Sequence, residues 1–255
     1  MLFWHSEPLP PPRAARLPRP RLHARELAKI ALRDHRVTDP YSNIRALRRI
    51  TREGLASVLL ISTNGAREFL AEQGIAATFV PLPLLPDDGR DLGLERDIDV
   101  LFLGAMDVPR RKRMIGRLRR DGVAVVTAGG WGEANISGEP RTELLNRTKI
   151  LLNFPRHPGL LSGRRMLLGM ANKAVVLAEP VYRPEPYRPG VHFVSSPLAE
   201  MPGVIRELLD DEDRRARIAD DAYRFVRSEM ALERIVPRVL QLVDARLSAG
   251  RDSPV

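Results

Sequence analysis

Short apolar runs recur through the second part of the chain, separated by stretches with helical spacing. The runs lie at residues 99–105 (DVLFLGA), 123–128 (VAVVTA), 150–154 (ILLNF), 174–178 (AVVLA) and 191–195 (VHFVS). Because they do not alternate polar with apolar residues, they are typical of parallel strands that helices cover on both faces. We therefore expect an α/β fold with a doubly wound parallel sheet over residues 97–230.

The first part of the chain, residues 1–85, predicts a smaller and partial α/β portion. Prolines between residues 8 and 20 favour an extended loop, and helical spacing follows at 24–32 and 43–52. Apolar runs at 57–61 and 77–80, with a helical stretch between them, then predict two βα units.

Loop-forming residues precede the predicted sheet domain, and helical stretches follow its last strand. Prolines, charges and an Asp-Gly turn follow one another in PLPLLPDDGRD, residues 81–91, and we expect a linker at 86–96. After the last strand, helical spacing at 201–209, 214–229 and 231–247 predicts helices that pack around the sheet and its neighbour. We expect the last of them to form a C-terminal helix and tail at 231–255.

Composition excludes several classes of site and location. The chain has 255 residues and no cysteine, which excludes disulfides and thiolate metal sites, and its five histidines lack metal-ligand spacing. We expect no bound metal. No run approaches the roughly 18 apolar residues of a transmembrane helix, and the opening MLFWHSEPLPPP does not read as a signal peptide. We expect a cytoplasmic protein, with peripheral membrane contact left open.

The net charge of +9 would suit nucleic acid, an anionic membrane or a phosphorylated small molecule. Only four of the 41 basic residues are lysine, an arginine excess that a GC-rich genome produces without selection for binding. Aromatic content is 5%, and no pattern of interleaved aromatic and basic residues is present. We therefore expect no nucleic-acid partner.

The loop after the first strand of the predicted sheet could hold an anion. In a doubly wound sheet, ligands bind at the carboxyl ends of the strands, where backbone N–H groups and helix N-termini are exposed. Here Gly104 permits close approach of the backbone, and Arg110, Arg111 and Lys112 supply positive charge. The alternative is a solvated basic helix face.

A second candidate anion site follows the third strand. Asn153, Arg156 and His157 lie in a loop shaped by proline and glycine, and Ser162, Gly163, Arg164 and Arg165 open the next helix. The hydroxyl, the free N–H groups and the arginines could meet a phosphate or a sugar hydroxyl. Ordinary helix capping with surface arginines is the alternative, and His157 is more often a surface residue than a general base. Trp131 in the glycine-rich loop 129–132 could stack on a base or pack on a helix.

Five blocks of the sequence resemble a known family: DIDVLFLGAMDVPRRKRMIGRL, NRTKILLNFPR, SGRRMLLGMANKAVVLAEP, PYRPGVHFV and LLDDEDRRARIADDAYRFV. In this order, from Asp97 to about Leu242, they are similar to the C-terminal domain of CgeB-like glycosyltransferases, relatives of glycosyltransferase groups 1 and 4. The resemblance implies a GT-B architecture, with two doubly wound domains, and a nucleotide-sugar held mainly by the C-terminal one. It also implies that basic side chains and helix N-termini balance the phosphate charge, with no metal or other cofactor.

The sequence departs from this family pattern at two points. The family often has R-x-F-E-A-L-A-C-G-A where this chain has RMLLGMANKA, so Leu168 stands at the glutamate position and Lys173 at the glycine position. Leucine cannot accept a hydrogen bond from a ribose or sugar hydroxyl, so we expect donor binding to be weakened, altered or supplied by another residue such as Glu179. The portion before the linker is also short, and MLFWHSE is similar to an interior strand of the N-terminal GT-B domain, so we expect its first strands to be absent.

Two functions follow as hypotheses from the residues and the resemblance. The first is a metal-independent glycosyltransferase that moves a sugar from a nucleoside-diphosphate donor to an unknown acceptor. The second is a non-catalytic nucleotide-binding or interaction module derived from such an enzyme, acting for example as a partner subunit. No catalytic residue can be named from the sequence.

Overall fold

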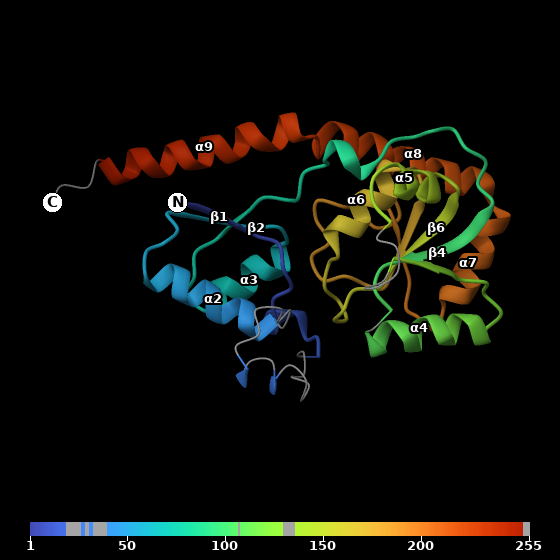
Figure 1. The fold of residues 1–255 in the computed structure, drawn as a ribbon, viewed down its shortest axis with the longest axis horizontal. Helices are drawn as coiled ribbons and strands as arrows, with labels where there is room; N and C mark the ends of the chain where they lie inside the picture. The colour runs from blue at the N-terminus through green and yellow to red at the C-terminus, as the bar shows by residue number, and fades with distance from the viewer. Residues whose placement is uncertain (19–26, 29–30, 33–39, 107, 130–135, 252–255) are drawn as a thin grey trace. The chain divides into compact units, whose positions relative to one another are not determined.

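The computed structural model describes residues 1–18, 27–28, 31–32, 40–106, 108–129 and 136–251 (Figure 1). The chain divides into two compact units. Unit 1 consists of Met1–Leu82 and Ile235–Val255, and unit 2 of Pro83–Arg234. Each unit has its own parallel sheet. The helix expected at 24–32 and the loop residue Trp131 lie largely or wholly outside the described residues.

Unit 1 is built on three parallel strands in the order β1-β2-β3. The strands are β1 (Leu2–His5), β2 (Val58–Ile61) and β3 (Thr78–Phe79), and the helices are α2 (Pro40–Arg52) and α3 (Asn64–Glu72), with a 3₁₀ turn η1 (Arg13–Ala15). The two βα units expected from the sequence are thus present. Thr63 begins α3 as its N-cap, because its side chain accepts a hydrogen bond of 3.3 Å from the backbone N–H of Ala66.

Alternate residues of β2 show how the small sheet of unit 1 is buried on both faces. Leu59 and Ile61 pack into a cluster with residues of α2 and α3, whereas Leu60 faces a second cluster. That second cluster contains Ile235 of helix α9 (Leu232–Arg251). From Ile235 onward the final helix therefore belongs to unit 1 and covers one face of its sheet.

Unit 2 is a five-stranded parallel sheet in the order β5-β4-β6-β7-β8. Its strands are β4 (Ile98–Leu103), β5 (Val126–Ala128), β6 (Thr148–Asn153), β7 (Val175–Ala178) and β8 (Val194–Ser195). Its helices are α4 (Pro109–Arg120), α5 (Glu139–Asn146), α6 (Gly163–Ala171), α7 (Met201–Asp210) and α8 (Glu212–Glu229). The prediction of an α/β fold with parallel strands is confirmed.

Helices cover both faces of the unit 2 sheet, which explains why its strands are apolar throughout. Val100 and Phe102 of β4 face a cluster with residues of α4 and α7, and the intervening Leu101 and Leu103 face a cluster with residues of α5 and α6. β5 and β8 are both shorter than their apolar runs, and β8 has the shorter length of the two. A tight turn precedes it, closed by a 2.7 Å hydrogen bond from the N–H of Gly190 to the carbonyl of Phe193.

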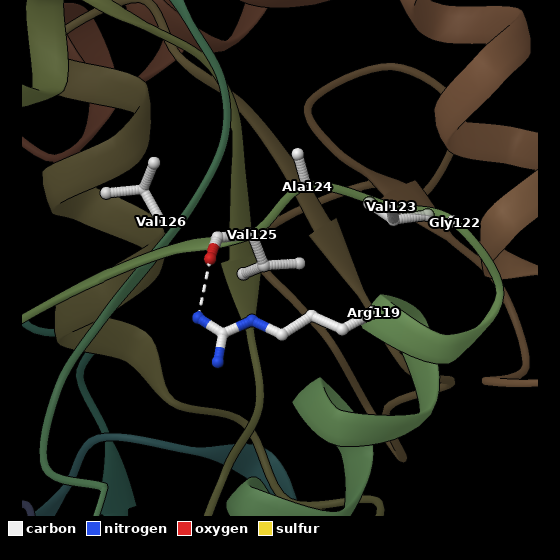
Figure 2. Close-up of a pocket in the computed structure, with 6 residues that line it drawn as sticks. All are labelled: Arg119, Gly122, Val123, Ala124, Val125 and Val126. Carbon is white, nitrogen blue, oxygen red and sulfur yellow. Dashed lines mark hydrogen bonds between the residues drawn. The ribbon is translucent and has the colours of Figure 1, made fainter.

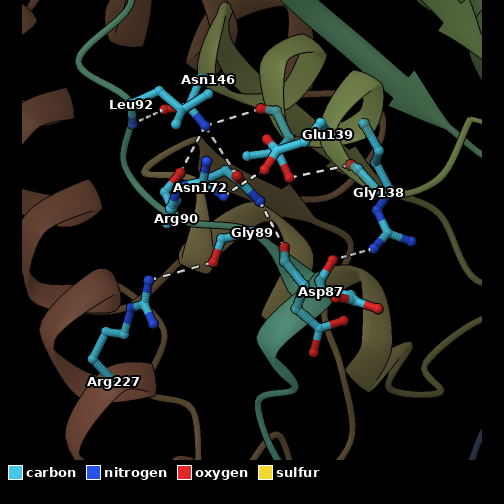
Figure 3. Close-up of polar contacts among 12 residues, drawn as sticks. Asp87, Gly89, Arg90, Leu92, Gly138, Glu139, Asn146, Asn172 and Arg227 are labelled. Carbon is cyan, nitrogen blue, oxygen red and sulfur yellow. Dashed lines mark hydrogen bonds and ion pairs between the residues drawn. The ribbon is translucent and has the colours of Figure 1, made fainter.

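The stretch expected as a linker lies within unit 2 and is held there by two buried asparagines (Figure 3). Asn172 donates a hydrogen bond of 2.9 Å to the carbonyl of Asp88, the last residue of the 3₁₀ turn η2 (Pro86–Asp88). Asn146 donates to the carbonyl of Arg90 and accepts from the N–H of Leu92. These bonds satisfy backbone groups of Asp88, Arg90 and Leu92, so this segment is attached to unit 2.

Candidate functional site

The carboxyl ends of the unit 2 strands meet at one edge of the sheet, which is where ligands bind in this fold class. Residues that follow β4, β6 and β7 come together there. From the first loop come Gly104, Arg110 and Arg111, and from the second comes Asn153 at the end of β6. Arg165 reaches the same place from the first turn of α6.

Arg165 lies at the centre of this edge and is only 9% exposed. Its Nε donates to the carbonyl oxygen of Leu103 over 2.8 Å, at the end of β4. Its Nη1 donates to Oδ1 of Asn153 over 3.0 Å and to the carbonyl oxygen of Phe154 over 3.2 Å. The guanidinium therefore bridges the ends of two neighbouring strands.

Gly104 makes room for this arginine. Its φ of +148° lies in a region that residues with a side chain rarely adopt, and a Cβ added there would stand 2.8 Å from Nη2 of Arg165. Its N–H also donates to the carbonyl of Ala128 at the end of β5 over 2.8 Å. A glycine directly after β4 is thus required by the position of a side chain from α6.

Arg111 is the second buried arginine of this edge, at 6% exposure. Its Nε donates to the carbonyl of Phe154 over 3.0 Å and its Nη1 to the carbonyl of Ala105 over 3.2 Å. Arg111 and Arg165 both lie over the ring of Phe102, at 5.5 and 5.1 Å from its centroid. We call the group formed by Gly104, Arg111, Asn153 and Arg165 around Phe102 the arginine cluster.

The arginine cluster carries buried positive charge. Burial, together with repulsion from Arg111 and Arg156, lowers the pKa of Arg165 to about 9. Carbonyl and amide oxygens contact the guanidinium, and the charged groups that shift its pKa are both arginines. A buried charge is costly unless an opposite charge compensates it, so an anion at this edge would be stabilised.

Arg110 lies beside the arginine cluster and is paired with a carboxylate. Its Nη2 forms an ion pair with Oε2 of Glu179, the residue that follows β7, and its Nη1 donates to the carbonyl of Pro155 over 3.1 Å. Both side chains are largely buried. Glu179 was expected from the sequence only as an alternative acceptor for hydroxyl groups.

Two of the expected basic residues point elsewhere. Lys112 is exposed on α4, because α4 turns its Met114 and Ile115 side to the sheet. Arg164 forms a 2.5 Å ion pair with Asp88 in η2 instead of turning toward the arginine cluster. Arg164 and Arg165 are neighbours in the helix, so their side chains leave α6 in different directions.

The remaining expected residues lie in the loop after β6 and at the start of α6. Arg156 and His157 are half-buried in the loop after β6. Ser162 occupies the N-cap position of α6, and within the described residues its hydroxyl makes no capping bond to that helix. Gly163 is the first residue of α6. The first turn of this helix and the hydroxyl of Ser162 thus stay available at the carboxyl edge.

Sequence reasoning missed two residues that the structure singles out. The sequence predicts Phe102 only as part of an apolar strand. Its contact with Arg111 and Arg165 depends on tertiary packing, so no local pattern indicates it. His5 ends β1 in unit 1, is 8% exposed, and its Nε2 has no hydrogen-bond partner among the described residues. Burial lowers the pKa of His5, opposed in part by a hydrogen bond that the imidazole donates to the backbone of Glu7.

A shallow pocket lies at the opposite edge of the unit 2 sheet, where the chain enters β5 (Figure 2). Val123, Ala124, Val125 and Val126 line it, and Arg119 crosses it to donate a 2.7 Å hydrogen bond to the carbonyl of Val125. Its guanidinium is used to hold the backbone before the strand. The pocket offers little polar chemistry, so the arginine cluster is the stronger candidate site.

Neither a cluster of potential metal ligands nor a membrane-spanning helix is found in the described residues. No group of three His, Asp or Glu side chains lies together there as it would around a metal ion. Among the same residues, no helix has the length and apolar character needed to cross a membrane.

Comparison with protein families gives one match. Residues 110–241 match the model of a family described as glycosyl transferase-like. This match covers more than half of the chain and includes α4, β6, α6 and β7, which supply most of the arginine cluster and the pair of Arg110 with Glu179. No curated protein matches the chain.

Comparison with solved structures gives similar folds at low identity. A mutant of TarM from S. aureus, in complex with Fondaparinux, alpha-GlcNAc-glycerol and UDP, has a TM-score of 0.56 at 13% identity, over 74% of this chain and 44% of that chain. HepE from Anabaena, in complex with UDP and glucose, has a TM-score of 0.57 at 12% identity, over 74% and 64%. Sucrose-phosphate synthase from Thermosynechococcus elongatus has a TM-score of 0.57 at 13% identity, over 76% and 59%. The chain thus spans about half to two thirds of the length of these structures, whose GT-B fold it shares.

Proposed function

Because the chain belongs to the glycosyl transferase-like family, we propose that it moves a sugar from a nucleoside-diphosphate sugar to an acceptor. The observation that carries this proposal is the arginine cluster. It places two buried guanidinium groups and the start of α6 at the carboxyl edge of the sheet. This is the position at which a doubly wound sheet binds the phosphates of a nucleotide.

The chemistry of sugar transfer gives the cluster a role. When the bond between the sugar and the diphosphate breaks, negative charge develops on the leaving phosphate oxygens. Positive charge that is already in place and already desolvated stabilises that charge without reorganisation. Arg165 and Arg111 meet this description because hydrogen bonds to backbone carbonyls fix both of them.

Several finer points belong to the same proposal. Charge balance by arginines supports a transferase that uses neither a metal nor another cofactor. UDP is present in the structures of HepE and TarM, so UDP-sugars are the first donors to test. We further propose a CgeB-like enzyme that works in the cytoplasm on an acceptor of unknown class.

Calorimetry with UDP, GDP and ADP tests the proposal. We expect at least one of them to bind with millimolar affinity or better. Arg165→Lys keeps a positive charge but loses the fork that bridges Leu103 and Asn153, and should weaken binding roughly tenfold to a hundredfold. Arg214→Ala is the control, since this arginine lies on α8 and pairs loosely with Glu207.

The same titrations can reject the donor site. If Arg165→Lys and Arg214→Ala weaken binding equally in folded protein, charge acts diffusely and the arginine cluster is not a site. If no nucleoside diphosphate binds, while DNA binds with a steep salt dependence, the chain is a nucleic-acid-binding protein instead.

A non-catalytic nucleotide-binding module is the second candidate function, and Leu168 favours it. This leucine is 7% exposed and packs with Leu101, Leu103 and Leu151 in an apolar cluster, so it offers the donor no hydrogen bond. The two functions differ in one measurement. A transferase should release UDP from a UDP-sugar in the presence of a suitable acceptor or slowly with water, whereas a module should bind the same compound and leave it intact.

A further inference from the structure

The ion pair between Arg110 and Glu179 joins three loops of the carboxyl edge. Arg110 comes from the first turn of α4, and Glu179 follows β7 directly. The carbonyl of Pro155, in the loop after β6, accepts from the other end of the same guanidinium over 3.1 Å. The side chains of Arg110 and Glu179 are 19% and 17% exposed, so they are shielded from bulk water but reachable from the edge.

Glu179 has unused acceptor capacity. A carboxylate offers two oxygens with about four acceptor positions. In the described part of the chain, Glu179 receives its one hydrogen bond at Oε2, from Arg110. Asp88, the other carboxylate paired with an arginine of this region, already accepts from Arg164 and from the N–H of Leu85 and is almost fully buried. Glu179 is therefore the better placed of the two to accept hydroxyl groups of a ligand.

The position that could supply such a carboxylate from α6 is apolar. Leu168 packs into the core between the sheet and α6, so this helix contributes no acceptor for ribose or sugar hydroxyls there. A nucleotide-sugar presents both kinds of group to the edge. Its phosphates prefer an arginine, and its hydroxyls prefer a carboxylate.

We propose that donor binding breaks the ion pair between Arg110 and Glu179. Arg110 then forms an ion pair with a donor phosphate, and Glu179 accepts hydrogen bonds from donor hydroxyls. This assignment rests on the proposed function, because it needs a ligand with both a diphosphate and hydroxyl groups. Glu179 becomes a specificity-determining residue. It penalises anions that lack hydroxyls, since these must break the ion pair without giving the carboxylate a new partner.

The exchange predicts effects of opposite sign for two kinds of ligand. In Glu179→Gln the ion pair is absent, so inorganic pyrophosphate no longer has to displace a carboxylate from Arg110. Its affinity should rise roughly threefold to tenfold. A ligand whose hydroxyls contact Glu179 loses a charged acceptor, so its affinity should fall roughly tenfold relative to pyrophosphate.

Titrations of the full chain with pyrophosphate, UDP and UDP-glucose test the assignment. If the ribose supplies the hydroxyls, UDP and UDP-glucose should both lose affinity relative to pyrophosphate in Glu179→Gln. If the sugar supplies them, UDP-glucose alone should do so. The matched control is Asp97→Asn, which removes an exposed carboxylate paired with Arg147 at the start of β4 and should leave all three affinities unchanged.

Three outcomes are decisive against the assignment. If Glu179→Gln changes all three affinities by the same factor, Glu179 does not accept hydrogen bonds from the hydroxyls of the ligand. If Arg110→Gln leaves pyrophosphate binding unchanged, Arg110 does not pass to phosphate. If the unaltered protein binds none of the three ligands, the donor site itself is absent and the proposed function fails with it. Thermal melting of each variant shows whether it is folded.

Discussion

Both sheets of this chain consist of parallel strands, but the side chains at their carboxyl edges differ. In unit 2 the edge holds buried arginines, and in unit 1 it holds His5 at the end of β1 and Ser62 after β2. Burial lowers the pKa in both places, for Arg165 and for His5. With a pKa of about 9, Arg165 keeps its proton at pH 7, whereas a histidine shifted below 6.5 loses it.

The difference shows which edge can bind an anion. Desolvation acts on both side chains in the same direction, but only the guanidinium starts from a pKa high enough to stay charged. Among the described residues, the buried titratable side chain at the strand ends is thus cationic in unit 2 and neutral in unit 1. The units also differ in continuity, since unit 2 is one segment and unit 1 needs residues from both ends of the chain.

The largest expected effect concerns that continuity. A fragment of residues 83–234 contains all five strands and both core clusters of unit 2, so it should fold cooperatively and keep its nucleotide binding. A fragment of residues 1–82 lacks Ile235, which packs on Leu60 and Val80, and should stay largely unfolded. Circular dichroism and thermal melting distinguish the two. Cooperative melting of the shorter fragment would show that unit 1 does not depend on α9.

Close packing of the unit 2 core should give the next largest effect. A Cβ at Gly169 would stand 2.5 Å from Cγ2 of Val176 and 2.9 Å from Cδ2 of Leu151, so Gly169→Ala should cost about 1–3 kcal/mol of unfolding free energy. Gly116→Ala is the control, because nothing lies near its Cβ in α4 and alanine favours a helix by about 1 kcal/mol. Denaturant unfolding should thus shift in opposite directions. A shift in the same direction would mean that α6 can move away from the sheet.

The pH dependence of stability tests whether buried His5 is neutral in the folded protein. Its folded-state pKa is lowered, so the unfolded chain binds the proton more readily, and the stabilisation present above pH 6.5 is lost as pH falls through the folded pKa. His5→Gln should remove part of this loss. His192 in unit 2 has a pKa lowered by burial as well, so His192→Gln is the matched comparison. Melting of both variants between pH 7 and 5 measures the two contributions, and an unchanged pH profile in His5→Gln would count against buried, neutral His5.

The smallest expected effect is at Lys173, which has a φ of +54° that suits glycine. Its Nζ lies 3.0 Å from Asp91 and 2.9 Å from Asp220, and these carboxylates raise its pKa. Lys173→Gly relieves the backbone and loses the ion pairs, so its stability should stay within about 0.5 kcal/mol of the unaltered protein. Lys173→Ala keeps the same unfavourable backbone as the lysine and loses only the ion pairs, so it should cost about 0.5–1 kcal/mol and be less stable than Lys173→Gly. Equal stability of both variants would show that the backbone carries no strain.

Local sequence patterns predict much of the fold but only part of the candidate site. Apolar runs predict strands because burial on both faces leaves no room for polar alternation, and they succeeded for β4, β6 and β7. The roles of neighbouring arginines could not be predicted. Arg164 turns to Asp88 and Arg165 to Leu103, and this choice depends on how α6 is rotated against the sheet.

Burial of charge was equally hidden from the sequence. The acceptors of Arg111 and Arg165 are mostly backbone carbonyls, which every residue has, so no residue type marks them. The linker shows the same difficulty. Prolines and charges in residues 81–91 predict a connector, yet two asparagines far away in the sequence, Asn146 and Asn172, bind its backbone.

The contact between Gly104 and Arg165 has a consequence for how such sequences can evolve. Any side chain at position 104 would occupy the space of the guanidinium and would also have to adopt a φ of +148°. A shorter residue at position 165 would relieve the clash but not the backbone strain. Homologous sequences should therefore be able to lose Arg165 while keeping Gly104, whereas a side chain at position 104 should be disfavoured whether or not Arg165 is present.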